Sequence, residues 1–148
     1  MEPDFAHTLP PGGKGPSVLL DTLEEELAGR GVPMATVSSV LLAVDELVSN
    51  VRNHGGADAS VEVAGQVTDE QVTLTITDDG PAFDPLAAEA PDTTLGVDER
   101  EVGGLGIHLV RRMMDRVVYR RVGNHNCLQF SKSYAPPSPS RQRAGGTS

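Results

Sequence analysis

The sequence predicts an α+β fold: a two-layer α/β sandwich whose mixed, mostly antiparallel sheet carries helices on one face. Three observations predict it. Strand-like segments with alternating apolar residues come in pairs joined by short turns, which is typical of hairpins. Segments with apolar residues at helical spacing separate these pairs. Threonines occupy alternate positions of one strand, at Thr73, Thr75 and Thr77, so we expect the opposite face of the sheet to be wet.

The N-terminal part of the chain predicts one strand and two helices. Residues 4–9 alternate and are typical of a short edge strand. Residues 17–28 carry leucines at helical spacing, with Glu24 to Glu26 expected to face water, and glycines follow. A long second helix begins near Pro33, carries an apolar stripe of valines and leucines, and ends at the Gly55–Gly56 pair.

The next segments predict a hairpin and then a long loop. Residues 61–67 and 72–77 alternate between apolar and polar side chains on either side of a short polar turn. Residues 86–102 have no clear period and are rich in Ala, Pro, Asp and Glu. A loop of that length inside a small domain is usually functional or disordered.

The C-terminal part predicts a third helix and a closing hairpin. The helix opens in GGLGIHLVRRMMD, and the strands cover residues 116–122 and 127–134. Residues 135–148 consist largely of Pro, Ser, Gly and Arg, which predicts a disordered tail. We therefore expect a single domain over residues 1–134.

Composition narrows the classes of partner and compartment. The formal net charge of −9 argues against direct binding to nucleic acid through phosphate contacts. A single cysteine, Cys127, rules out an internal disulfide and a cysteine metal cage. The N-terminus lacks the basic and apolar regions of a signal peptide, and no run is expected to reach the roughly 18 apolar residues of a membrane span. We expect a cytoplasmic protein without a membrane partner.

Polar side chains crowd onto the end of the second helix, in the stretch DELVSNVRNHGG. Glu46 and Asn50 lie four residues apart and share a face beside the apolar stripe, and Asn53 and His54 extend that line. One interpretation is a solvated helix edge. The other is a carboxylate and an amide aimed into a cleft, where the amide oxygen suits Mg²⁺ and the carboxylate suits proton transfer.

Asp78 ends the second strand of the first hairpin. Counting by twos from Val72 through Leu74 and Ile76 places its carboxylate on the apolar side, where a charge needs a partner. Gly80 follows and permits close approach of a ligand to the backbone. The alternative is an aspartate that starts the turn DDGP.

Glycines mark the start of the third helix, at Gly103, Gly104 and Gly106. Without side chains, the amides of a first helical turn are open to an anion such as a phosphate chain. The alternative is a glycine-rich loop that only packs tightly.

Together these segments resemble the histidine-kinase-like ATPase superfamily, also called GHKL. DELVSNVRNHG resembles its N box, DDGPAFDP its first glycine box and GGLGIHLVRRMMD its second, in the family's order. VGNHNCLQFSK is similar to the family's closing hairpin. The resemblance covers about residues 5–134 and implies ATP bound between the helices and a mobile lid.

The resemblance also implies a role for each matching residue. Asn50 would coordinate Mg²⁺ on the phosphates, and Glu46 would act as the general base. Asp78 would accept a hydrogen bond from the adenine amino group, over a floor shaped by Gly80. Ala82 stands where many members have a second glycine, and its methyl group would intrude slightly on the nucleotide.

Further positions follow from the same resemblance. Asn53 and His54 would line the pocket near the sugar or the phosphates, and residues 86–102 would form the ATP lid. The backbone amides implied to bind the phosphates are those of Gly103, Gly104, Leu105 and Gly106.

Within the superfamily, the chain looks like the anti-sigma-factor serine/threonine kinases of bacterial partner switching. The residues before Ser17 are too few for the dimerising helical hairpin of a sensor kinase. The resemblance implies phosphorylation of a small anti-sigma antagonist, binding to a sigma factor, and often a homodimer. Two alternatives stay open: a non-catalytic, ATP-gated binding module, to which Ala82 is the only hint, and an interaction domain that binds no nucleotide. The arginines of residues 111–121 form either a partner surface or a solvated face.

Overall fold

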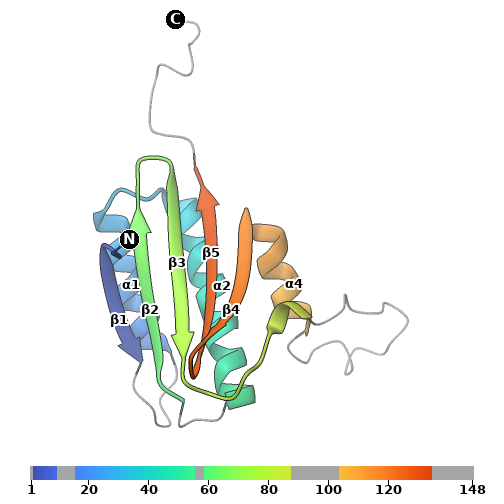
Figure 1. Cartoon of the computed structure of the whole chain (residues 1–148). Helices are drawn as coiled ribbons and strands as arrows, with labels where there is room; N and C mark the ends of the chain where they lie inside the picture. Colours follow the sequence, from blue (N-terminus) through green and yellow to red (C-terminus); the bar gives the residue numbers. More distant parts are fainter. Residues whose placement is uncertain (1, 10–15, 56–58, 88–103, 135–148) are drawn as a thin grey trace, which may run out of the picture.

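The computed structural model describes residues 2–9, 16–55, 59–87 and 104–134 (Figure 1). In chain order the elements are β1 (Phe5–Leu9), α1 (Ser17–Gly29), α2 (Met34–Gly55), β2 (Val61–Val67), β3 (Gln71–Asp78), the 3₁₀ turn η1 (Pro85–Ala87), α4 (Gly104–Met113), β4 (Arg116–Val122) and β5 (His125–Ser133). The predicted tail at residues 135–148 lies outside the described residues.

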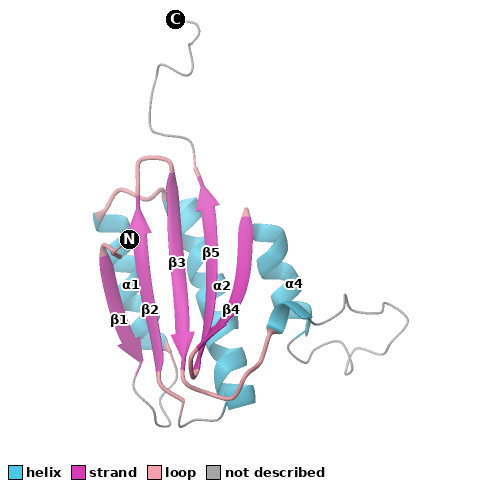
Figure 2. Ribbon diagram, viewed as in Figure 1, coloured by secondary structure: helices cyan, strands magenta, loops and turns pink. Residues whose placement is uncertain are grey.

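The five strands form one sheet in the order β1-β2-β3-β5-β4. Each neighbouring pair is antiparallel, so the sheet is fully antiparallel, whereas the sequence predicted a mixed, mostly antiparallel sheet. Figure 2 shows α1 and α2 on one face of the sheet and α4 on its β4 side. The predicted two-layer α+β fold is confirmed.

The core lies between α2 and the inward side chains of the strands. Four valines of the α2 stripe are fully buried, Val37, Val40, Val44 and Val48, as are the alternating residues Val61, Val63 and Leu74 of the first hairpin. The threonines of β3 lie on the other face and are only half-buried. Gly65 of β2 is required by this packing, because a Cβ there would overlap the ring of Phe5 and the side chain of Leu74.

Glu26 does not simply face water as expected. Its carboxylate accepts a hydrogen bond from Nε of Arg30 at 2.8 Å and is bonded to Nε2 of His7 at 2.9 Å. The hydrogen bond with His7 is the main cause that holds the pKa of Glu26 below its usual range. The contact ties α1 to the edge strand β1.

The helix α2 is longer and more apolar than expected, since no run was expected to reach the length of a membrane span. Residues Met34–Asn53 are long and apolar enough to cross a membrane by length and composition, with a mean hydropathy of 1.4. The apolar stripe of this helix is instead buried in the protein core, against α1 and the sheet. Burial on one side of a sheet explains the hydropathy without a bilayer.

Candidate functional site

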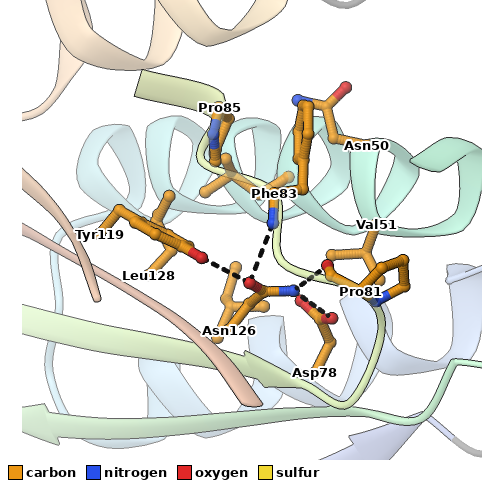
Figure 3. Close-up of a pocket in the computed structure, with 11 residues that line it drawn as sticks. Asn50, Val51, Asp78, Pro81, Phe83, Pro85, Tyr119, Asn126 and Leu128 are labelled. Atoms are coloured by element: carbon orange, nitrogen blue, oxygen red, sulfur yellow. Dashed lines mark hydrogen bonds between the residues drawn. The ribbon is translucent and has the colours of Figure 1, made fainter. Parts of the chain in front are cut away.

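A cavity opens between α2, the ends of β3 and β5, and the loop that follows β3 (Figure 3). Its enclosed volume is about 30 Å³, and the figure rises to about 440 Å³ only when the open solvent at its mouth is counted. The apolar wall consists of Leu47, Val51, Ile76, Pro81, Phe83, Pro85 and Leu128. The polar groups on its lining come from Asn50, Asp78, Tyr119 and Asn126. A mostly apolar cavity with a few converging polar groups is the usual form of a small-molecule site.

Asp78 lies where the strand alternation predicts, on the inner side of β3, and is 6% exposed. Its Oδ1 accepts hydrogen bonds from the backbone N–H of Gly80 at 2.9 Å and from Nδ2 of Asn126 at 3.0 Å. Among the described residues, none donates to its Oδ2. The carboxylate is therefore held through Oδ1, and Oδ2 can accept a hydrogen bond from a ligand.

Asn126 is the partner of Asp78 across the sheet, since the two residues are paired in the β3–β5 register. Its Nδ2 also donates to the carbonyl oxygen of Pro81 at 2.9 Å. Its Oδ1 accepts from the hydroxyl of Tyr119 at 2.6 Å and from the backbone N–H of Phe83 at 3.2 Å. One buried amide thus joins β3, β4 and the loop after β3, as Figure 3 shows.

Asn50 enters the cavity from α2 and is 5% exposed. Its amide makes no hydrogen bond to another residue in the described part of the chain. In Figure 3 this amide points away from the Asp78 carboxylate. The nitrogen and oxygen of this amide are not among the fully enclosed polar atoms that lack a partner, so the amide is open at the cavity and available to a ligand.

Glu46 lies one helical turn before Asn50 and is half-buried. It is not part of the cavity wall. Its carboxylate instead lies directly against the first turn of α4, since a Cβ built on Gly106 would overlap it. The predicted base and the predicted phosphate-binding glycine therefore meet.

The other predicted positions divide into three groups. Gly80 is buried and holds the loop after β3, because its N–H binds Asp78 and its carbonyl oxygen accepts from Nη1 of Arg121 at 2.8 Å. Asn53 and Ala82 are exposed and do not line the cavity. Gly103 and the side chain of His54 lie outside the described residues.

The first turn of α4 contains Gly104, Leu105 and Gly106 as predicted. The predicted lid begins in a fixed turn: Leu86 and Ala87 belong to η1, and the carbonyl oxygen of Leu86 accepts from Nη1 of Arg111 at 3.3 Å. The rest of the predicted lid, residues 88–102, lies outside the description.

Asn126 and Tyr119 also line the cavity, although neither was predicted from the sequence as a site residue. Counting by twos along β5 from Phe130 through Leu128 reaches Asn126, so the alternation that placed Asp78 inward also places this amide inward. The signal was available. Tyr119 gave no such signal, because its position depends on how β4 pairs with β5.

The cavity suits a flat, partly apolar ligand with a hydrogen-bond donor. The apolar wall offers a surface for the faces of such a ligand, and the free oxygen of Asp78 offers an acceptor for its edge. The described residues contain no group of three or more His, Cys, Asp or Glu side chains that would hold a metal by themselves. Asn50 offers one hard oxygen ligand, which fits Mg²⁺ only if phosphates and waters complete the octahedron.

Comparison with known proteins agrees with this geometry. The sequence model of the histidine kinase-like ATPase domain matches residues 17–132. Serine/threonine-protein kinase BtrW of Bordetella bronchiseptica is 31% identical over 103 residues, covering 68% of this chain and 72% of BtrW. Serine-protein kinase RsbW of Staphylococcus epidermidis is 28% identical over 127 residues, covering 78% of each chain.

Solved structures agree in fold. The catalytic domain of the histidine kinase ThkA, in a nucleotide-free form, superposes with a TM-score of 0.53 at 11% identity, covering 89% of this chain and 99% of that domain. A second nucleotide-free form of the same domain gives a TM-score of 0.51. By its sequence, its fold and the order of its site segments, the chain belongs to the histidine kinase-like ATPase domain family.

Proposed function

We propose that this chain is a cytoplasmic, ATP-dependent serine/threonine protein kinase that phosphorylates a small anti-sigma antagonist protein and binds a sigma factor. The observation that carries the proposal is the pair Asn50 and Asp78, both buried, polar and open to one cavity. Related chains named serine or serine/threonine protein kinases support the reaction class.

In this proposal the purine of ATP lies against the apolar wall that surrounds Asp78, and its amino group donates to the free oxygen of Asp78. The phosphates extend toward Asn50 and the first-turn amides of α4, where the helix dipole favours an anion. When bound, Mg²⁺ offsets the charge that develops on the phosphates during transfer. Asn50 is the residue that would hold it.

Glu46 is suited to act as the general base because it lies beside the first turn of α4. The carboxylate of Glu46 accepts the proton of the substrate hydroxyl. The hydroxyl oxygen of the substrate then forms the new bond to the γ-phosphorus. The bond from the γ-phosphorus to the bridging oxygen breaks, and ADP leaves. The products are ADP and a phosphoserine or phosphothreonine on the antagonist.

A substitution at Glu46 tests the assignment of the base. We expect Glu46→Gln to bind ATP nearly as well as the wild type and to lose about 10²- to 10⁴-fold in the rate of transfer, as is usual when a general base is removed. The measurement is transfer of labelled phosphate from Mg-ATP to a candidate antagonist, with calorimetry for binding. Glu62→Gln is the control, because Glu62 is an exposed glutamate on β2. Normal transfer by Glu46→Gln would show that another group is the base.

The same assay separates the kinase from an ATP-gated binding module. Tight ATP binding without transfer to any antagonist would favour the module. The sequence hint for that alternative was the methyl group of Ala82, and this side chain is exposed and away from the cavity wall. The geometry therefore favours the kinase.

A further inference from the structure

We propose that the free edge of β4 is a docking site for an extended, acidic segment of a partner protein, which adds to the sheet as a further strand. The surface lies outside the cavity, so the inference does not depend on nucleotide binding or on phosphoryl transfer. It decides between the two interpretations of the arginines of residues 111–121, a partner surface and a solvated face.

The arginines of this segment differ in their contacts. Arg111 and Arg121 each donate to a backbone carbonyl oxygen of the domain. Arg112, Arg116 and Arg120 are exposed and make no hydrogen bond or ion pair with any residue that the structure describes. These three positive charges are therefore available to a partner.

The hairpin of β4 and β5 is locally basic in an acidic chain. Residues 116–133 contain four arginines or lysines and no aspartate or glutamate, although the whole chain has a formal net charge of −9. Arg116 is paired with Ser131 and Arg120 with Cys127, so no carboxylate lies opposite either arginine in the sheet. An acidic partner would supply the counter-charge that the hairpin lacks.

The backbone of β4 also has an unused side. The strand is last in the sheet order β1-β2-β3-β5-β4 and pairs only with β5, as Figure 1 shows. Its other side makes no backbone hydrogen bond to a residue in the described ranges. A row of unpaired N–H and C=O groups is a template for an added strand.

This edge is held in place by contacts on the inner side of β4. The hydroxyl of Tyr119 donates to Oδ1 of Asn126 at 2.6 Å. Nη1 of Arg121 donates to the carbonyl oxygen of Gly80 at 2.8 Å. A partner strand therefore meets an edge that is already ordered, which lowers the entropic cost of binding.

Alternation along β4 defines the sequence of a complementary strand. Val117 and Tyr119 pack against the core, so the alternate residues lie on the outer face of the sheet. These are Arg116, Val118, Arg120 and Val122. A matching strand carries acidic residues four positions apart, with an apolar residue midway between them.

Other occupants of the edge are less compatible with these charges. A second copy of β4 would set arginine beside arginine, which is unfavourable. A nucleic acid or an anionic membrane would be repelled by the net charge of −9 of the chain. The arginines thus exclude self-association through this edge and favour an acidic strand.

Two synthetic peptides test the charge and the strand geometry together. The first, acetyl-Thr-Glu-Thr-Val-Thr-Glu-Thr-amide, places both glutamates on one face of a strand. The second, acetyl-Thr-Glu-Thr-Val-Glu-Thr-Thr-amide, has the same composition and charge, but its glutamates lie on opposite faces. In NMR titrations of the full chain, we expect the first peptide to bind about three- to tenfold more tightly. It should also slow hydrogen exchange at the amides of β4.

Charge reversal tests the two arginines of the edge. We expect Arg116→Glu and Arg120→Glu each to weaken binding of the first peptide about three- to tenfold. The double variant should prefer the lysine counterpart, acetyl-Thr-Lys-Thr-Val-Thr-Lys-Thr-amide. Arg112→Glu is the control, because it makes the same change of charge at an exposed position of α4 and should bind the first peptide like the wild type. Circular dichroism confirms that each variant is folded.

Several results would overturn the inference. They are equal binding of the two glutamate peptides, unchanged exchange at the β4 amides, and unchanged peptide affinity in the folded Arg116→Glu and Arg120→Glu proteins. Tighter binding of a short DNA duplex or of phosphatidylserine vesicles through these arginines would assign the edge to a different partner. A dimer in sedimentation experiments, with the β4 amides already protected, would assign it to a second copy. Phosphoryl transfer is measured separately, so none of these results decides the proposed function.

Discussion

Glu46 occupies the space that a side chain at position 106 would fill. The two residues come from different helices, α2 and α4, which contact each other in the fold. Glycine at position 106 therefore does more than expose an amide to an anion. It lets the carboxylate of Glu46 lie directly on the helix turn that is proposed to hold the phosphates.

Gly106→Ala tests this contact. The new methyl group must displace the carboxylate, while the backbone N–H of residue 106 stays in place. We expect phosphoryl transfer to fall about tenfold to a hundredfold, because a displacement of about 1 Å at a reacting group has effects of that size. ATP binding, measured by calorimetry, should change much less.

Gly29→Ala is the matched control, because this glycine also lies in a helix and a Cβ there meets nothing within 4 Å. It should transfer phosphate like the wild type. Equal transfer by Gly106→Ala and the wild type would contradict the positioning of Glu46 by this glycine.

Single residues differ in how far the sequence could place them. Strand alternation was sufficient for Asp78, and the same count would have found Asn126. Helical spacing placed Asn50 correctly, but it also included Asn53, which shares that side of α2 and is exposed near the end of the helix. The contact of Glu46 with Gly106 depends on how two helices pack, and no local pattern contains that information.

At the scale of elements, two contacts join the end of α4 to β5. Nζ of Lys132 donates to the carbonyl oxygen of Met113, at the C-terminus of the helix, at 2.8 Å. Asp115 accepts from the backbone N–H of Ser133 at 2.6 Å and from its hydroxyl. These contacts fix the turn between α4 and β4 against the last strand of the sheet.

The contact of Asp115 predicts a specific dependence of stability on pH. The hydrogen bond from the Ser133 hydroxyl is the main cause that lowers the pKa of Asp115, so the folded state holds this proton less tightly than the unfolded state. Its stabilisation is present above the ordinary carboxyl range of about pH 4 and is lost as the pH falls through the lowered pKa. Glu26, whose pKa is lowered mainly by His7, contributes with the same sign.

We expect Asp115→Asn to be less stable at neutral pH and to lose less stability than the wild type on acidification. Urea unfolding at a series of pH values from about 6 to 3 measures this. Asp21→Asn, at an exposed position of α1, serves as the control. Parallel stability curves for Asp115→Asn and the wild type would show that the Ser133 contact does not carry the dependence.

The elements themselves were largely predictable. The bounds of β2 and β4 agree with the alternation, and α1 is one residue longer than expected. The largest difference is β5, which begins at His125 and not at Cys127. The strand begins with two polar residues, His125 and Asn126, so the apolar alternation did not predict that they belong to it. Their place in the strand follows from the pairing with β3 and β4.

For the whole molecule, nucleotide binding should increase the free energy of unfolding and raise Tm. A ligand at about 100 times its dissociation constant adds about 2.7 kcal/mol to a folded state that alone binds it. For a domain of this size that raises Tm by roughly 5 to 10 °C. We expect Mg-ATP to produce this rise and EDTA to reduce it, since Asn50 is proposed to act through the metal.

The Asn50→Ala variant separates the rise in Tm caused by ATP alone from the additional rise caused by Mg²⁺. It should keep the smaller rise that ATP gives in EDTA and lose the additional rise that Mg²⁺ gives. Differential scanning fluorimetry measures each condition. An Asn50→Ala protein whose Tm responds to Mg²⁺ as strongly as the wild type would exclude this residue as the metal ligand.

The sequence predicted both hairpins, but it did not predict how they join. Hairpin partners are close in the chain, and their alternation and turns are local signals. The β3–β5 pairing joins residues about 50 positions apart, such as Thr77 and Cys127, and places the final strand inside the sheet. Only the packing of the complete domain determines that order.

The strand β5 follows the other four in the chain but fills an interior place in the sheet, between β3 and β4. While the protein is still emerging from the ribosome, β3 therefore has an open edge that invites pairing with other chains. Asp78 lies at that edge, and its hydrogen-bond partner Asn126 is 48 residues further along the chain. The proposed nucleotide site is therefore incomplete in a nascent chain until residues 125–133 have been synthesised.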